Sequence, residues 1–193
     1  AEEIKYCLDL SEADALIFGF EFIDRMASII DQIPNVKLRF YAGEDCPSFA
    51  ESYDHLAAVC LTEAPQIELT DEDDAAIYFS SGTTGFPKAI LHNHTSLMSS
   101  CQTEQNHHGQ TREDNFLCIP PLYHTGAKMH WFGSLLSGSK AVLLRGVKPQ
   151  WILKAISEEN VTIVWLLVPW AQDILDAIER GDVKLEDYKL DQW

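Results

Sequence analysis

The stretch AAIYFSSGTTGFPKAILH, residues 75–92, places a polar loop between two apolar segments. Residues 75–79 and 89–92 are short and apolar, which predicts two strands that hold the ends of the loop. The loop itself, Ser80 to Lys88, is rich in hydroxyl side chains and glycine and ends on a lysine. This composition predicts either an anion site or an ordinary flexible turn, because serine, threonine, glycine and proline are also common turn residues.

The physical chemistry of the loop suits a phosphate group. Two glycines let the backbone approach a ligand closely, so that consecutive N–H groups can point at one anion. The hydroxyls add donors, and the lysine adds a positive charge against terminal phosphates. The loop is not a Walker A motif, because it lacks the four-residue gap and the Gly-Lys pair. The predicted phosphate-binding residues are Ser80, Ser81, Gly82, Thr83, Thr84, Gly85 and Lys88.

Apolar segments that suit strands alternate along the chain with segments of helical spacing. The predicted strands are 14–20, 36–41, 75–79, 89–92, 116–119, 141–144 and 161–168. The predicted helices are 21–33, 48–60, 94–108 with Asn93 as its cap, 126–137, 149–160 and 169–180. This alternation predicts an α/β fold with a doubly wound, largely parallel sheet and helices on both faces.

An acidic, polar stretch interrupts this pattern at residues 62–74. It contains Pro65 and the run Asp71 to Asp74, as a solvated linker does. The sequence therefore predicts a partial α/β sub-region at 1–61, a linker at 62–74, and a second partial α/β sub-region at 75–193 that carries the phosphate loop.

Composition excludes several classes of partner. The formal net charge is -16, so the summed field repels phosphate backbones and anionic lipid surfaces. The longest strongly apolar run, 163–171, falls short of the roughly 20 residues that a bilayer needs. Five cysteines without a CxxC pair suit reduced thiols better than a disulfide framework. We expect no nucleic-acid partner, no membrane span and a cytoplasmic location.

The sequence Tyr78 to Lys88 closely resembles the signature of the adenylate-forming (AMP-binding) superfamily, which includes acyl-CoA synthetases, peptide-synthetase adenylation domains and firefly luciferases. In that family the loop holds the β- and γ-phosphates of ATP while a carboxylate attacks the α-phosphorus. One position departs from the pattern. Ala89 stands where the family usually has glycine, which would be costly if the backbone there needed a positive φ.

A second segment, Pro120 to Gly126, resembles the family's Pro-Leu-aromatic-His motif in the form typical of fatty-acyl synthetases. In the family this histidine lies where the acyl chain, the adenylate and the thiol channel meet. The resemblance therefore implies that His124 is the catalytic residue of this chain. Without the resemblance, a lone histidine beside a proline turn is more often structural.

The resemblance also implies an acyl pocket formed by Trp131, Val168 and Trp170, although core packing is the simpler interpretation of the two tryptophans. We predict no metal site in the chain. His92 and His94, and likewise His107 and His108, have no ligand cluster at the usual spacings to complete a four-ligand set.

The resemblance extends loosely over 14–193 and implies an internal fragment of the family's large N-terminal domain. The family's adenine segment with its magnesium-binding glutamate, the ribose-binding aspartate and the lid lysine have no counterpart in this sequence. The resemblance implies an intact acyl-CoA synthetase that uses ATP, Mg²⁺ and CoA on a carboxylic acid, with a fatty acid expected. The fragment alone is expected to be inactive, and missing N- and C-terminal parts of its own chain are expected partners.

Two alternatives remain open. The intact protein could adenylate an acid for another acceptor, such as a carrier-protein thiol. It could also be a non-catalytic ATP-binding or interaction module that kept the phosphate loop and lost the remaining groups.

Overall fold

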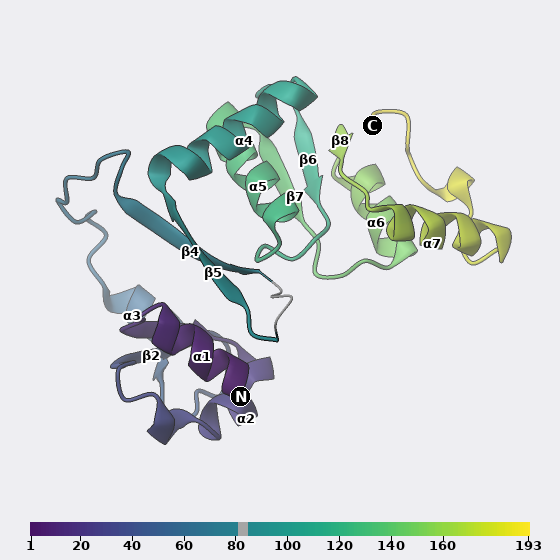
Figure 1. Ribbon diagram of the computed structural model, residues 1–193. Helices are drawn as coiled ribbons and strands as arrows, with labels where there is room; N and C mark the ends of the chain where they lie inside the picture. Colours follow the sequence, from purple (N-terminus) through teal and green to yellow (C-terminus); the bar gives the residue numbers. More distant parts are fainter. Residues whose placement is uncertain (81–84) are drawn as a thin grey trace. The chain divides into compact units, whose positions relative to one another are not determined.

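The computed structural model describes residues 1–80 and 85–193, and these residues form two compact units. Unit 1 comprises residues 1–94 and unit 2 comprises residues 95–193. The loop residues Ser81, Gly82, Thr83 and Thr84 lie outside the described part of the chain. Each unit is built around its own sheet and its own hydrophobic core (Figure 1).

Unit 1 contains a three-stranded parallel sheet with the order β1-β2-β3. Its strands are β1 (Ala15–Phe18), β2 (Leu38–Tyr41) and β3 (Glu51–Ser52). The helical segments around it are α1 (Glu2–Leu10), η1 (Phe20–Phe22), α2 (Ile23–Ala27), η2 (Ile30–Gln32) and α3 (Tyr53–Val59). The buried core of this unit consists of Phe18, Met26, Ile29, Ile33, Val36 and Tyr41. The strand–helix–strand order predicted for residues 14–41 is present.

Two predicted helices of unit 1 are shorter than expected. The helix predicted over 21–33 is regular only at α2, and 3-10 turns stand on both sides of it. The Ser28 hydroxyl donates to the Arg25 carbonyl at 2.7 Å, and such side-chain bonds to the backbone compete with a continuing helix. The helix predicted over 48–60 begins only at Tyr53, because Glu51 and Ser52 are extended and pair with β2. Ser52 then caps α3 by accepting from the His55 N–H at 3.3 Å.

Helix α1 was not predicted from the sequence. Its residues Ile4 and Leu8, four positions apart on one face, pack against the core of unit 1. The polar residues between them hide this short apolar stripe in the sequence.

An antiparallel hairpin completes unit 1. Strands β4 (Asp74–Ser80) and β5 (Lys88–Asn93) pair along their whole length, with one irregularity between Asp74 and Ala76. The predicted linker, 62–74, lies inside unit 1 and is an exposed segment with little regular structure. The boundary between the two compact units lies after His94. The division predicted from the sequence, with 62–74 as a linker between two sub-regions, stays a prediction.

Unit 2 contains the second parallel sheet, with the order β7-β6-β8. The strands are β6 (Asn115–Cys118), β7 (Lys140–Leu143) and β8 (Ile163–Val164). The helices are α4 (His94–His108), α5 (Thr125–Ser137), α6 (Pro149–Glu158) and α7 (Val168–Glu179), and η3 (Leu185–Asp187) follows. Helix α4 begins one residue before the boundary between the units.

Successive side chains of the central strand β6 point to opposite faces of this sheet, as the pleat requires. Phe116 stacks on His130 of α5, with 4.4 Å between the ring centroids. Leu117 instead joins the core formed with Ile152 and Ile156 of α6. Helices therefore cover both faces of the β7-β6-β8 sheet.

Strand β8 is much shorter than the predicted strand at 161–168. Its register pairs Phe116 with Ile163 and Leu117 with Val164. The pairing ends at Leu117 and Val164, and α7 begins at Val168 with Pro169 in its first turn.

The predicted α/β class with parallel sheets and helices is confirmed. The strands are divided among two three-stranded parallel sheets and one antiparallel hairpin. Among the described residues, none of the helices combines the length and the hydropathy that a bilayer crossing needs.

Candidate active site

The β4–β5 hairpin holds both ends of the predicted phosphate loop. Ser80, the last residue of β4, lies directly opposite Lys88, the first residue of β5, in the antiparallel register. Whatever the conformation of residues between them, the pairing fixes the distance that the loop spans. The exposed Lys88 side chain and the Ser80 hydroxyl therefore start from neighbouring positions at the base of one loop.

Gly85 has a φ of 109°, which L side chains rarely adopt. A β-carbon placed on Gly85 would meet no heavy atom within 4 Å, so the glycine is needed for its backbone conformation and not for space. The returning arm of the loop is anchored in two ways. Pro87 is buried, and the Phe86 ring lies 4.8 Å from the Tyr6 ring of α1.

Ala89 fits its position without strain. It lies in β5 opposite Phe79, and the only non-glycine residues of the described chain with positive φ are Glu12, Asp45 and Asn160. The replacement of the family's usual glycine by Ala89 therefore costs no backbone strain in this structure.

His124 caps the N-terminus of α5. Its Nδ1 accepts a hydrogen bond from the Gly126 N–H at 3.1 Å. Because Nδ1 is the acceptor, a neutral His124 ring carries its hydrogen on Nε2. The ring is exposed, so Nε2 is an accessible donor at the start of a helix whose free N–H groups favour negative charge.

Gly126 is required by the packing of Trp165 against α5. A β-carbon at Gly126 would lie 2.6 Å from Cη2 and 2.7 Å from Cζ3 of the Trp165 ring. Trp165 also lies near the His124 ring, with 6.1 Å between the centroids. The glycine of the second motif thus lets an aromatic ring approach the helix beside the predicted catalytic histidine.

The three predicted acyl-pocket residues lie in different surroundings. Trp131 stacks on Phe132 at 5.1 Å between centroids. Val168 is 82% exposed, and Trp170 packs against the core cluster formed by α6 and β6. Their role in acyl binding remains a prediction.

Two polar side chains are buried in unit 2 near the second motif. Lys128 lies on α5 one turn after His124, and burial lowers its pKa from the ordinary value. The pKa of the fully buried Cys101 on α4 is raised by burial and lowered in part by the charge of Lys128. This pair could not be predicted from the sequence, because nothing in the residue spacing of α4 and α5 shows which of their faces meet.

The structure also assembles a group that was not predicted from the sequence. Glu104 and His108 of α4 and His130 of α5 bring their ligand atoms within 4.8 Å of one another. The spacing of four residues between Glu104 and His108 places both on one face of the predicted helix. This spacing was the one feature of the sequence that could have indicated the group. His130 joins them only through the packing of α5 on α4.

A large apolar hollow lies elsewhere, in unit 1. It has a volume of about 660 Å³ and is lined by Ile17, Phe40, Glu51, Tyr53, Leu56, Ala57 and Cys60. The lining is almost entirely hydrocarbon and contains neither motif. The hollow therefore does not bear on the prediction that the chemistry lies at the two motifs.

The chain belongs to the AMP-binding enzyme family, whose pattern it matches over residues 1–190. It is 26% identical to 3-oxocholest-4-en-26-oate–CoA ligase of Rhodococcus rhodochrous over 94% of this chain and 36% of that protein. It is 30% identical to Triostin synthetase I of Streptomyces triostinicus over 86% of this chain and 30% of that protein.

Among solved structures, the fold is similar to that of the anthranilate CoA ligase AuaEII in complex with anthranoyl-AMP. The TM-score is 0.87 at 23% identity, over 99% of this chain and 37% of that one. The chain thus spans about a third of the length of the relatives it matches, and its family is that of adenylate-forming ligases.

Proposed function

We propose that the whole protein is an ATP-dependent acyl-CoA synthetase that converts a fatty acid, ATP and CoA into acyl-CoA, AMP and pyrophosphate through an acyl-adenylate. The observation that carries the proposal is the hairpin that pairs Ser80 with Lys88 at the base of the family's signature loop. The family assignment and relatives named as CoA ligases support it.

In the first half-reaction, the carboxylate oxygen of the acid attacks the α-phosphorus of ATP and pyrophosphate leaves. In the proposal the loop residues Ser80 to Lys88 hold the β- and γ-phosphates. The Lys88 ammonium stabilises the negative charge that grows on the departing pyrophosphate. Magnesium, when bound with ATP, neutralises further phosphate charge, and we assign no residue of this chain to it.

In the second half-reaction, the thiol sulfur of CoA attacks the acyl carbonyl carbon and loses its proton to solvent, and AMP leaves with the electron pair of the acyl C–O bond that breaks. His124 is proposed to act at this carbon. Its Nε2–H, fixed in that tautomer by the Gly126 N–H at Nδ1, can donate a hydrogen bond to the acyl oxygen. Trp131, Val168 and Trp170 are proposed to limit the shape of the acyl chain.

The isolated chain is proposed to be inactive. A phosphate loop supplies a few charge-assisted hydrogen bonds, while ordering a loop costs about 1 to 2 kcal/mol per backbone residue fixed. We also propose that the whole protein is cytoplasmic, as expected from the sequence.

The test is a product assay on the whole protein with ATP, Mg²⁺ and CoA across fatty acids of graded length and aromatic acids. The proposal predicts acyl-CoA formation with at least one fatty acid as the preferred substrate. Preference for an aromatic acid would contradict the fatty-acid assignment. Absence of pyrophosphate release with every acid would contradict the enzymatic assignment and favour a non-catalytic ATP-binding module.

One further candidate is adenylation for a carrier-protein thiol. It is supported by the 30% identity to Triostin synthetase I, a relative that is not named as a CoA ligase. Acid-dependent pyrophosphate release without any acyl-CoA product would favour this acceptor over CoA.

A further inference from the structure

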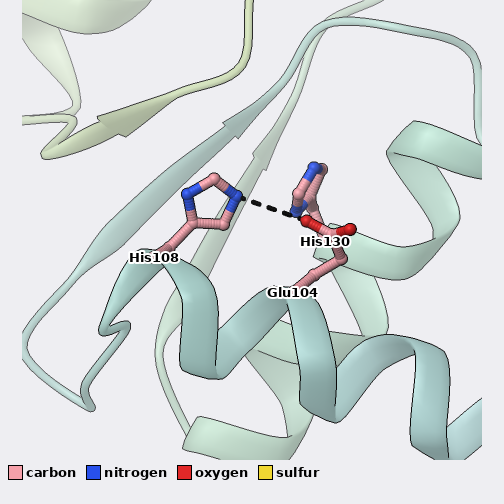
Figure 2. A group of neighbouring side chains, drawn as sticks. All are labelled: Glu104, His108 and His130. Atoms are coloured by element: carbon pink, nitrogen blue, oxygen red, sulfur yellow. Dashed lines mark ion pairs between the residues drawn. The ribbon is translucent and has the colours of Figure 1, made fainter.

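A group of three potential metal ligands lies between α4 and α5 (Figure 2). Glu104 and His108 extend from the same face of α4, four residues apart, and His130 reaches them from α5. Glu104 Oε2 lies 3.7 Å from His108 Nε2. All three ligand atoms lie within 4.8 Å of one another. None of these residues belongs to either motif of the proposed active site.

The two histidines are held in place by packing. His130 is only 3% exposed and lies flat on Phe116, with an angle of 19° between the ring planes. The His108 ring lies 5.1 Å from His130 and 5.9 Å from Phe116, between centroids. The imidazoles therefore occupy fixed positions, as ligands of a preformed metal site do.

Both imidazoles carry a buried nitrogen without a hydrogen-bond partner in the described part of the chain. These atoms are Nδ1 of His130 and Nε2 of His108. A buried polar atom left unpaired costs about 1 to 3 kcal/mol, so such atoms call for an explanation. A cation accepting their lone pairs would satisfy both. An ordinary core histidine would instead find a carbonyl or hydroxyl partner.

The group combines one carboxylate, Glu104, with two imidazoles, His108 and His130.

We propose that Glu104, His108 and His130 form a binding site for a divalent transition-metal ion, with Zn²⁺ as the ion that fits best. Two imidazoles and one carboxylate are a known zinc ligand set, which leaves a fourth position for water or another ligand. Zinc–ligand bonds of about 2.0 to 2.2 Å separate the ligands of a tetrahedral site by roughly 3.4 Å.

The observed 3.7 Å between Glu104 and His108 is close to that separation. All three ligand atoms lie within 4.8 Å of one another, so no pair needs to approach by more than about 1.4 Å when the ion binds. The Glu104 side chain is partly exposed and can change rotamer to meet the ion, whereas His130 is buried. Magnesium fits poorly, because it prefers six oxygen ligands in an octahedron.

The test is calorimetric titration of the metal-free protein with Zn²⁺, in millimolar Mg²⁺ to occupy sites for hard cations. The proposal predicts one tight zinc ion per chain that is lost or weakened at least 10-fold in Glu104→Gln and in His108→Gln. Glu104→Gln changes a partly exposed side chain without altering the core, so it keeps the test valid even where a His130 variant does not fold. Circular dichroism confirms that each variant is folded.

His107→Gln is the matched control. His107 is the neighbouring histidine on the same helix, it is exposed, and it lies outside the ligand group. The proposal predicts that His107→Gln leaves zinc binding unchanged. Zinc binding that is absent from the unmodified protein, or equal in the Glu104→Gln, His108→Gln and unmodified proteins, would overturn the site. Loss of binding in His107→Gln alone would also overturn it.

Discussion

The contact between Gly126 and Trp165 gives the sharpest prediction about packing beside His124. In Gly126→Ala, the new methyl group would lie 2.6 Å and 2.7 Å from two ring carbons of Trp165. Carbon atoms in contact prefer about 3.5 to 4.0 Å, so the ring or the first turn of α5 must shift by roughly 1 Å. The substitution keeps the Gly126 N–H that bonds to His124, and it therefore isolates the steric effect.

Overpacking of this kind costs about 1 to 3 kcal/mol. For a chain of this size, a loss of about 2 kcal/mol lowers Tm by roughly 4 to 8 °C. Thermal unfolding followed by circular dichroism measures the change. Truncation of the ring in Trp165→Leu should remove the clash, so the double variant should recover at least about 1 kcal/mol relative to the sum of the single changes.

Gly133→Ala is the control on the same helix. A β-carbon there meets its nearest atoms at 3.6 to 3.9 Å, an ordinary contact distance, and alanine favours a helix over glycine by about 1 kcal/mol. Gly133→Ala should therefore be neutral or stabilising. The reasoning is refuted if Gly126→Ala is as stable as Gly133→Ala, or if Trp165→Leu brings no recovery.

Two further predictions follow from buried titratable groups. Burial lowers the pKa of His130 to about 4, below the value of about 6.5 for histidine in an unfolded chain. Between these two pH values the unfolded chain binds more protons than the folded one. The free energy of unfolding should therefore fall on acidification from pH 6.5 to 4, by up to about 1.4 kcal/mol per pH unit. Urea titrations in the presence of a metal chelator measure the free energy of unfolding across this pH range. It should depend less steeply on pH in His130→Gln than in the unmodified protein, and an identical dependence would contradict the lowered pKa of His130. Burial raises the pKa of Cys118 to about 11, so at pH 8 a thiol reagent should label exposed Cys46 quickly and Cys118 only after unfolding. If the fast labelling disappeared in Cys118→Ser and persisted in Cys46→Ser, Cys118 would be the fast-reacting thiol and the predicted order would be wrong.

Local patterns were sufficient for most of the fold. The helix predicted over 126–137 agrees with α5, which Gly138 closes with a φ of 70°. The strands on either side of the phosphate loop were placed within one residue of β4 and β5. Their antiparallel pairing within a parallel fold could not be predicted, because partner choice is not a property of either strand alone.

The errors arose where distant residues decide the local structure. Strand pairing with β2 converts Glu51 and Ser52 from the predicted helix into β3. Pairing with β6 limits β8 to Ile163 and Val164, although the apolar run of the sequence is longer. At the site, the contact of Trp165 with Gly126 depends on tertiary packing, as does the position of His130 beside Glu104 and His108.

The central claim is that the hairpin loop ending at Lys88 binds the phosphates of ATP during adenylation. Acid-dependent exchange of radioactive pyrophosphate into ATP, measured on the whole protein, tests it most directly by comparing Lys88→Ala with Lys37→Ala. Lys37 is an exposed lysine of the same unit, paired with Asp14 at the surface, and serves as the control.

A charge-assisted hydrogen bond contributes about 1.5 to 3 kcal/mol, so Lys88→Ala should reduce exchange by about 10-fold or more. Lys37→Ala should leave it unchanged, because exposed ion pairs contribute little. Equal exchange in the Lys88→Ala and unmodified proteins would contradict the claim.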